Sequence, residues 1–184
     1  GDTAKDSHKT LPTVNFDSFR LENTEIYPFK KAIEQGLSSV MTAHLNVPSL
    51  TFSSDPTSLS PAVVNKLLRQ KIGFNGLAIT DALNMKGALP NDSDDNMDLL
   101  ALLAGNDVLL ISQDIPLGIE KIKNAYYNLP IVKRRVEESV KKILKAKYKV
   151  GLSQKIAVDT NNLQARLNTR KDTLLIEEAY SKSI

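Results

Sequence analysis

Short apolar runs that alternate with helical patterns constrain the fold of this 184-residue chain more than any other feature. The runs typical of strands are "SSVMTAHL" at 38–45, "GLAIT" at 76–80 and "DVLLIS" at 107–112. They are continuous rather than alternating in hydropathy, as in strands that helices cover on both faces. Helical patterns lie between and after them, at 60–74, 95–106 and 116–128. The order βαβαβα predicts a parallel sheet with right-handed crossovers.

Local signals support these helices. Ser60 and Pro61 form an N-cap and first-turn pair before the first helix, and Gly105 is placed to end the second. A longer basic helix is expected at 131–149, with its basic face in solvent. Its apolar residues are expected to be buried, namely Val136, Val140, Ile143 and Leu144.

Composition excludes several classes of protein. With 41% hydrophobic and 24% charged residues, the chain is globular rather than disordered. No apolar run approaches the roughly 18 to 20 residues that cross a bilayer, so we expect no membrane partner. The absence of cysteine excludes disulfides, thiolate zinc sites and a cysteine nucleophile, and leaves the compartment, periplasm or cytoplasm, open. Aromatic residues make up only 5%, which argues against a nucleic-acid partner despite the net charge of +3.

Two folds share this alternation, an open doubly wound sheet and a closed (β/α)8 barrel, and both place function at the carboxyl ends of the strands. A barrel ordinarily needs about 250 residues. With three strands, this chain fits a barrel only as a part of one. The strandless start, residues 1–29, is typical of an active-site loop that leads into a helix. After Gly151 the sequence reads as a linker, followed by a helix at 170–184.

Polar residues at the strand ends are the candidates for a site. They are His44 after the first strand, Asp81 after the second, and Asp6 and His8 in the opening loop. Each has a plain structural interpretation, which spacing alone favours: an aspartate that caps a helix, a half-buried histidine, or polar residues in a tail without a role. A metal site formed by His8, His44 and a carboxylate lacks the ligand spacing that would support it.

Several longer stretches resemble a known family. "GDTAKDSHKTLP", "VMTAHLNVPSL" and "LSPAVVNKLLRQKIGFNGLAITDALNMKGA" are similar to glycoside hydrolase family 3, in its bacterial β-N-acetylglucosaminidase branch. The resemblance continues through "AGNDVLLIS" and "RVEESVKKILKAKYKVGL". It implies that residues 1–152 are the C-terminal part of a (β/α)8 barrel, about three βα units with strands at the sixth to eighth positions. Residues 1–25 would then be the active-site loop, and 153–184 a linker and the start of a following domain.

The resemblance also implies roles for the candidate residues. Asp81 matches the family's catalytic nucleophile, and Asp6 and His8 match the loop-borne pair that serves this branch as general acid/base. His44 matches the strand motif "M-x-A-H" and is a supporting or substrate-binding candidate. Arg69 and Asn84 lie in matching stretches, and we expect a helix-surface arginine and a turn asparagine.

These roles predict a retaining exo-β-N-acetylglucosaminidase that needs no cofactor and acts on cell-wall muropeptides or related aminosugar glycosides. In the family, a Lys-His-Phe-Pro-Gly-His motif precedes the Gly-Asp-Thr with which this chain opens, and five further strands complete the barrel. We therefore expect the isolated chain to be inactive without that N-terminal half of the barrel as its partner. The alternatives are a non-catalytic α/β module that binds a small molecule or sugar, with Asp81 as a cap, and a barrel that binds sugar without cleaving it.

Overall fold

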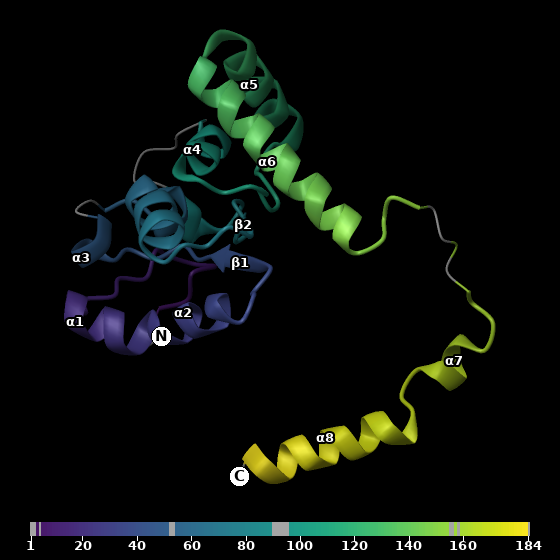
Figure 1. The fold of residues 1–184 in the computed structure, drawn as a ribbon. Helices are drawn as coiled ribbons and strands as arrows, with labels where there is room; N and C mark the ends of the chain where they lie inside the picture. Colours follow the sequence, from purple (N-terminus) through teal and green to yellow (C-terminus); the bar gives the residue numbers. More distant parts are fainter. Residues whose placement is uncertain are drawn as a thin grey trace. The chain divides into compact units, whose positions relative to one another are not determined.

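The computed structural model describes residues 3, 5–51, 54–89, 96–154, 157 and 159–183 (Figure 1). The chain divides into two compact units, Gly1–Ala146 and Lys147–Ile184. Among the described residues, no helix is both long enough and apolar enough to cross a membrane.

The first unit opens with helical turns and continues as strands and helices in alternation. Its elements are α1 (Ser18–Arg20), η1 (Leu21–Glu25), α2 (Tyr27–Glu34), β1 (Ser39–Thr42), α3 (Pro48–Thr51), η2 (Thr57–Leu59), η3 (Ala62–Lys71), β2 (Leu77–Thr80), η4 (Lys86–Ala88), α4 (Met97–Ala104), α5 (Ile115–Asn128) and α6 (Pro130–Lys149), the last of which runs into the second unit. The second unit holds α7 (Leu163–Arg166) and α8 (Arg170–Ser183), and α8 confirms the helix expected there.

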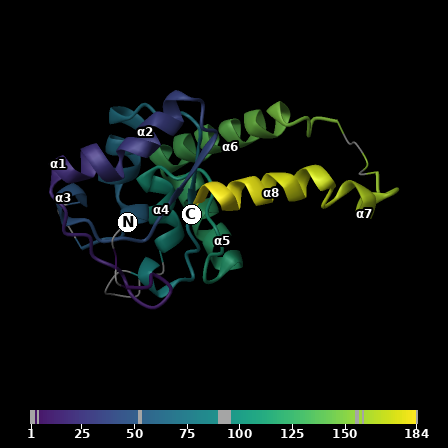
Figure 2. The same cartoon turned by 90° about the horizontal axis from the view of Figure 1, so that it is seen from below.

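β1 and β2 form a parallel pair, which confirms the pairing predicted from the sequence. Ser39 lies opposite Leu77 and Thr42 opposite Thr80. Val40 of β1 and Ala78 of β2 pack in one core cluster with Val64 and Leu68 of η3, whose apolar face covers the pair. In Figure 1 the two strands lie side by side, and Figure 2 shows the same fold turned by 90°, seen from below.

The expected third strand, 107–112, is wrong as a full strand. It joins the sheet through a parallel bridge between Ile79 and Val108. At two positions a side-chain oxygen accepts a hydrogen bond that a backbone carbonyl would accept in a regular β-ladder. The Asp107 carboxylate accepts the Ala78 N–H (3.1 Å), and the Thr80 hydroxyl accepts the Leu110 N–H (2.9 Å). The segment still lies beside β2, so the expected order of the three segments is retained.

The helix boundaries follow the signals in the sequence with two differences. The helix expected at 60–74 is η3, a π-helix that ends at Lys71. Ser60 was expected as its N-cap, which is wrong: Pro61 occupies that position, and the helix has no side-chain cap hydrogen bond. Gly105 ends α4 at φ 120°, in the left-handed region that favours glycine, as predicted. Residues 90–95, which include the first residue of the expected helix 95–106, lie outside the described residues. At α5 the Asp114 side chain accepts the Leu117 N–H and caps the helix.

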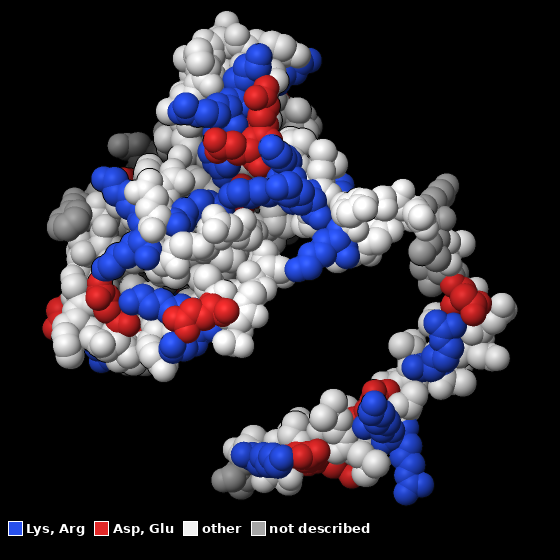
Figure 3. Space-filling view, in the orientation of Figure 1, with Lys and Arg blue, Asp and Glu red and all other residues white. Residues whose placement is uncertain are grey.

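The basic helix α6 forms as predicted, but its faces differ from the expectation. Val140 and Leu144 are exposed, at 46% and 59%, because the second half of α6 extends beyond the cluster of α4, α5 and α6 residues around Val132. Lysine and arginine side chains gather along this helix, with acidic groups among them (Figure 3). Two of the basic side chains turn inward, where a buried carboxylate holds them.

Candidate active site

Asp81 lies at the carboxyl end of a parallel strand, as predicted. It follows β2 directly, and its N–H donates to the Thr42 carbonyl at the end of β1 (2.9 Å). Its carboxylate accepts the N–H of Ala82 (2.8 Å), and no ion pair of Asp81 is present among the described residues. The next helix, η4, begins five residues later with Met85 at its N-cap, so Asp81 does not cap a helix. The half-buried carboxylate is therefore available at the carboxyl ends of the strands.

Asp6 and His8 form a compact pair. The Asp6 carboxylate accepts the His8 backbone N–H at 3.0 Å and the ring Nδ1–H at 2.8 Å. These two hydrogen bonds, the backbone one first, lower the pKa of Asp6. The His8 side chain is 74% exposed, and its Nε2 has no hydrogen-bond partner in the described part of the chain. The aspartate thus fixes the ring through Nδ1 and leaves Nε2 free for a ligand.

His44 is fully buried just beyond β1, and both ring nitrogens are engaged. Nε2 lies 3.0 Å from the Ala82 carbonyl and Nδ1 lies 2.6 Å from the Ser58 hydroxyl. Because a carbonyl only accepts, Nε2 carries the proton, and Nδ1 then accepts from Ser58 in the neutral ring. Its role toward substrate stays a prediction. Its contacts support a positioning role, since it holds the backbone directly after Asp81.

Burial lowers the pKa of His44, an effect that the Ala82 carbonyl and the Asp81 charge only partly oppose. The unfolded chain therefore binds a proton at about pH 6.5 that the folded chain rejects. We expect stability to be full above about pH 6.5 and to fall at lower pH, by up to about 1.4 kcal/mol per pH unit. Urea unfolding between pH 8 and 5 measures it. His44→Gln should be less stable and lack this slope, whereas His8→Ala, which changes the other histidine, should retain it.

Asn106 connects the end of β1 to its surroundings. Its fully buried side chain accepts from the Thr42 hydroxyl (2.9 Å) and donates to the carbonyls of Ser58 (2.8 Å) and Ala101 (2.7 Å). Asn106 was not among the residues predicted from the sequence. A polar side chain between the helix-ending Gly105 and an apolar run is the signal that could have found it.

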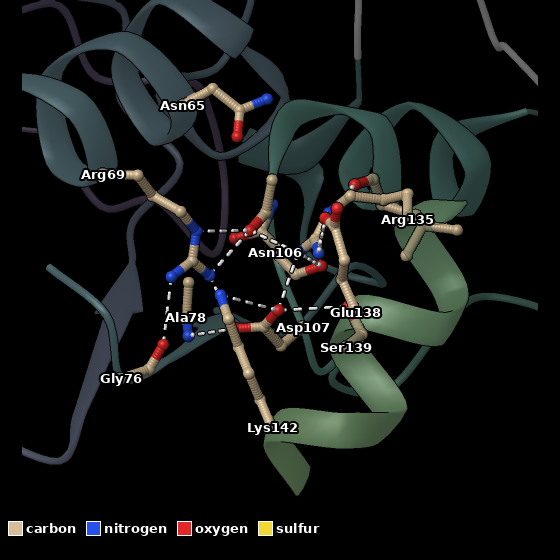
Figure 4. A network of polar contacts seen from close by, with 12 residues as sticks. Asn65, Arg69, Gly76, Ala78, Asn106, Asp107, Arg135, Glu138, Ser139 and Lys142 are labelled. Carbon is tan, nitrogen blue, oxygen red and sulfur yellow. Dashed lines mark hydrogen bonds and ion pairs between the residues drawn. The ribbon is translucent and has the colours of Figure 1, made fainter. Parts of the chain in front are cut away.

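Asp107 is the centre of a buried charge cluster at the other end of β2 (Figure 4). Its carboxylate is 0% exposed and accepts from Arg69 (2.6 Å), Arg135 (2.7 Å) and the Ser139 hydroxyl (3.0 Å). Arg69 was expected on the helix surface, which is wrong. It is 14% exposed, because its guanidinium also donates to backbone carbonyls, including that of Gly105.

The cluster holds more positive than negative charge. Lys142 Nζ lies 3.6 Å from the Asp107 carboxylate. Burial alone would raise the pKa of Asp107, but the Arg135 hydrogen bond, the Ala78 N–H and the charges of Arg69 and Lys142 lower it on balance. Burial lowers the pKa of Lys142, and the two arginines add to this effect. The aspartate that pairs with the basic helix α6 is thus Asp107 and not Asp81.

Asp107→Ala is expected to destabilise the protein by about 3–5 kcal/mol, because it leaves buried cations without their carboxylate. Glu138→Gln is the matched control. Glu138 is 56% exposed and lies 3.6 Å from the same Arg135, so its loss should change stability by less than about 1 kcal/mol. Urea unfolding at pH 7 compares the two. Equal effects of both substitutions would contradict this account of the cluster.

The structure connects the candidate residues through the backbone. Among the described residues, no hydrogen bond joins the side chains of His8 and Asp81. The opening loop instead meets the segment after Asp81, where the Gly87 N–H donates to the Ser7 carbonyl at 3.0 Å. Asn84, expected in a turn, lies in this segment and donates its N–H to the Ile111 carbonyl (3.0 Å). In the described part of the chain, no group of three or more His, Cys, Asp or Glu side chains could hold a metal.

Comparison with known proteins gives consistent relatives. Residues 1–146 match the glycosyl hydrolase family 3 N-terminal domain. The β-hexosaminidase of Methylobacillus flagellatus is 30% identical over 129 residues, which are 70% of this chain and 36% of that protein. The β-hexosaminidase of Chromobacterium violaceum is 32% identical over 106 residues, 58% of this chain and 29% of that protein. The chain therefore spans about a third of the length of these curated relatives.

Solved structures agree. A glycoside hydrolase family 3 β-N-acetylglucosaminidase from Paenibacillus sp. str. FPU-7 matches with a TM-score of 0.87 at 31% identity, over 97% of this chain and 34% of that one. The β-N-acetylglucosaminidase from Thermotoga maritima matches with a TM-score of 0.68 at 32% identity, over 79% of this chain and 32% of that one. The two parallel strands and their helices thus match part of a catalytic domain of this kind.

Proposed function

The chain belongs to glycosyl hydrolase family 3, and on that basis we propose that it is the C-terminal part of the catalytic barrel of a retaining exo-β-N-acetylglucosaminidase. The observation that carries the proposal is the geometry at the carboxyl ends of the strands. Asp81 ends a parallel strand, and the Asp6–His8 pair docks on the segment that follows Asp81. Similarity to β-N-acetylglucosaminidases supports the choice of sugar.

The proposed reaction is a double displacement in which Asp81 and His8 have separate roles. The Asp81 carboxylate attacks the anomeric carbon of a terminal β-linked N-acetylglucosamine and forms a glycosyl-enzyme. His8 gives a proton to the departing oxygen and then takes one from the water that hydrolyses the intermediate. Asp6 holds Nδ1–H and stabilises the imidazolium, which leaves Nε2 as the atom that transfers the proton.

The remaining assignments extend the same proposal. β1, β2 and the segment 107–112 would be the sixth, seventh and eighth strands of the barrel, within a domain portion that ends at residue 152. The preceding strands would supply further contacts to the sugar, and residues 153–184 would lead to a following domain. Cell-wall muropeptides and related aminosugar glycosides are the proposed natural substrates.

The test is hydrolysis of 4-nitrophenyl N-acetyl-β-glucosaminide by the protein that carries this chain together with the rest of its barrel. We expect turnover, with the β-anomer of N-acetylglucosamine as the first-formed product by NMR. The matching β-glucoside, which lacks the acetamido group, is the control and should be a poorer substrate. Binding of N-acetylglucosamine without turnover would instead identify a sugar-binding module.

A further inference from the structure

The turn that carries Asp6 and His8 meets the rest of the protein at a glycine. Within this DSH turn (residues 5–10) the hydrogen bonds are local, and the Asp6 carbonyl accepts two N–H groups at 3.0 Å to close it. Between described residues, two hydrogen bonds leave the turn: a long one from the Thr3 hydroxyl to the Lys5 carbonyl (3.5 Å) within the same loop, and one from the Gly87 N–H to the Ser7 carbonyl, which joins the turn to the rest of the fold. The position of His8 therefore depends on this contact.

Space, not backbone conformation, requires glycine at this position. Gly87 is not among the residues with positive φ, so any L-residue could adopt its backbone. A Cβ atom there would lie 2.6 Å from the Ser7 carbonyl oxygen and 2.9 Å from the Thr10 carbonyl oxygen. Both are backbone atoms, so no side-chain rotation relieves the contact. With any side chain at 87, either the DSH turn or the segment that contains Gly87 has to shift.

The segment that contains Gly87 is held more firmly than the DSH turn. Ala88 and Leu83, on either side of Gly87, are 0% exposed and share one core cluster with Leu59, Met97 and Ala101. The Leu83 N–H also donates to the Leu110 carbonyl at 2.8 Å. The DSH turn, by contrast, is largely exposed at Asp6 and His8. A side chain at 87 should therefore displace the turn.

We propose that Gly87 is a positioning residue, whose missing side chain lets the DSH turn dock by its backbone and sets the distance from His8 to Asp81. One short segment, 81–88, then carries the nucleophile Asp81 at its start and, near its end, Gly87, on which the DSH turn docks. This inference rests on the proposed function of His8 and Asp81.

Gly87→Ala, made in the enzyme that carries this chain with the rest of its barrel, tests it. We expect kcat/KM for an N-acetylglucosamine disaccharide, whose leaving group needs a proton, to fall by about 10- to 100-fold. The first step on the 2,4-dinitrophenyl glycoside, whose leaving group needs none, should change by less than about threefold. Azide should raise turnover on that substrate. Trypsin should also cleave faster at Lys5 and Lys9, since the turn is displaced.

Gly76→Ala is the matched control. A Cβ at Gly76 would lie 2.4 Å from the Ser38 carbonyl oxygen, an equally tight backbone contact at the other end of β2. This variant should lose stability and affect both substrates alike, with no change in cleavage at Lys5 and Lys9. Parallel losses on both substrates in Gly87→Ala, or failure of that variant to fold, would overturn the inference and leave the proposed function standing. An inactive parent enzyme would overturn both.

Discussion

Asp81→Ala is expected to lower turnover of every N-acetylglucosaminide by about 10⁴- to 10⁶-fold, whatever the leaving group. In the proposed mechanism the substitution removes the atom that forms the glycosyl-enzyme, so no activated substrate bypasses the defect. Steady-state rates with the disaccharide and with aryl glycosides of graded leaving-group pKa measure this. Because the Asp81 side chain accepts only the adjacent Ala82 N–H and takes part in no ion pair among the described residues, stability should change little.

Azide provides a product test of the same assignment. In Asp81→Ala the anion can occupy the space of the lost carboxylate and attack from that face, which gives the α-azide of the sugar. Asp114→Ala is the control, since it removes an exposed aspartate that caps α5, and it should retain activity. Full activity of Asp81→Ala, or equal losses in both variants, would exclude Asp81 as the nucleophile.

His8→Ala is expected to lower turnover by about 10²- to 10⁴-fold on poor leaving groups while sparing the first step on activated aryl glycosides. Hydrolysis of the intermediate still needs a base to deprotonate water, so it becomes slow. Rapid-mixing measurements should show a burst of phenol release and then a slow steady state. Azide should restore turnover and give the β-azide, because it attacks the glycosyl-enzyme from the face opposite Asp81.

Asp6→Ala should show a weaker form of this behaviour, since it leaves the imidazole in place but unsupported. Ser7→Ala is the control within the same turn. The contact of Ser7 with Gly87 uses its backbone carbonyl, which the substitution retains. If His8→Ala lost activity equally on good and poor leaving groups, with neither burst nor azide rescue, the acid/base role would belong to another residue.

What the sequence predicted well depends on local pattern. The parallel pairing of β1 and β2, the end of α4 at Gly105 and the helices α5, α6 and α8 follow from continuous apolar runs and capping residues, which act within a few positions of the chain. The place of Asp81 at a strand's carboxyl end follows from the same signals.

What the sequence did not predict depends on partners far apart in the chain. Arg69 and Asp107 are 38 positions apart, and a helical pattern cannot distinguish an arginine in solvent from one that reaches a buried carboxylate. The prediction of a third strand at 107–112 was wrong for a related reason. The side chains of Asp107 and Thr80 replace backbone hydrogen-bond partners there. Gly87 reads as an ordinary turn glycine until the Ser7 and Thr10 carbonyls are seen against it.

The Asp107 cluster lies apart from the loops in which such a protein can diverge. Asp107 binds the backbone at Ala78, three residues before Asp81, or about 10 Å along the strand. The residues that anchor α6 are therefore at one end of the strands, and Asp81, the proposed nucleophile, is at the other. Descendants of this sequence can change the loops around Asp81 while they retain the Asp107 cluster, so in the proposed glycosidase a new specificity need not be accompanied by a new way to fold.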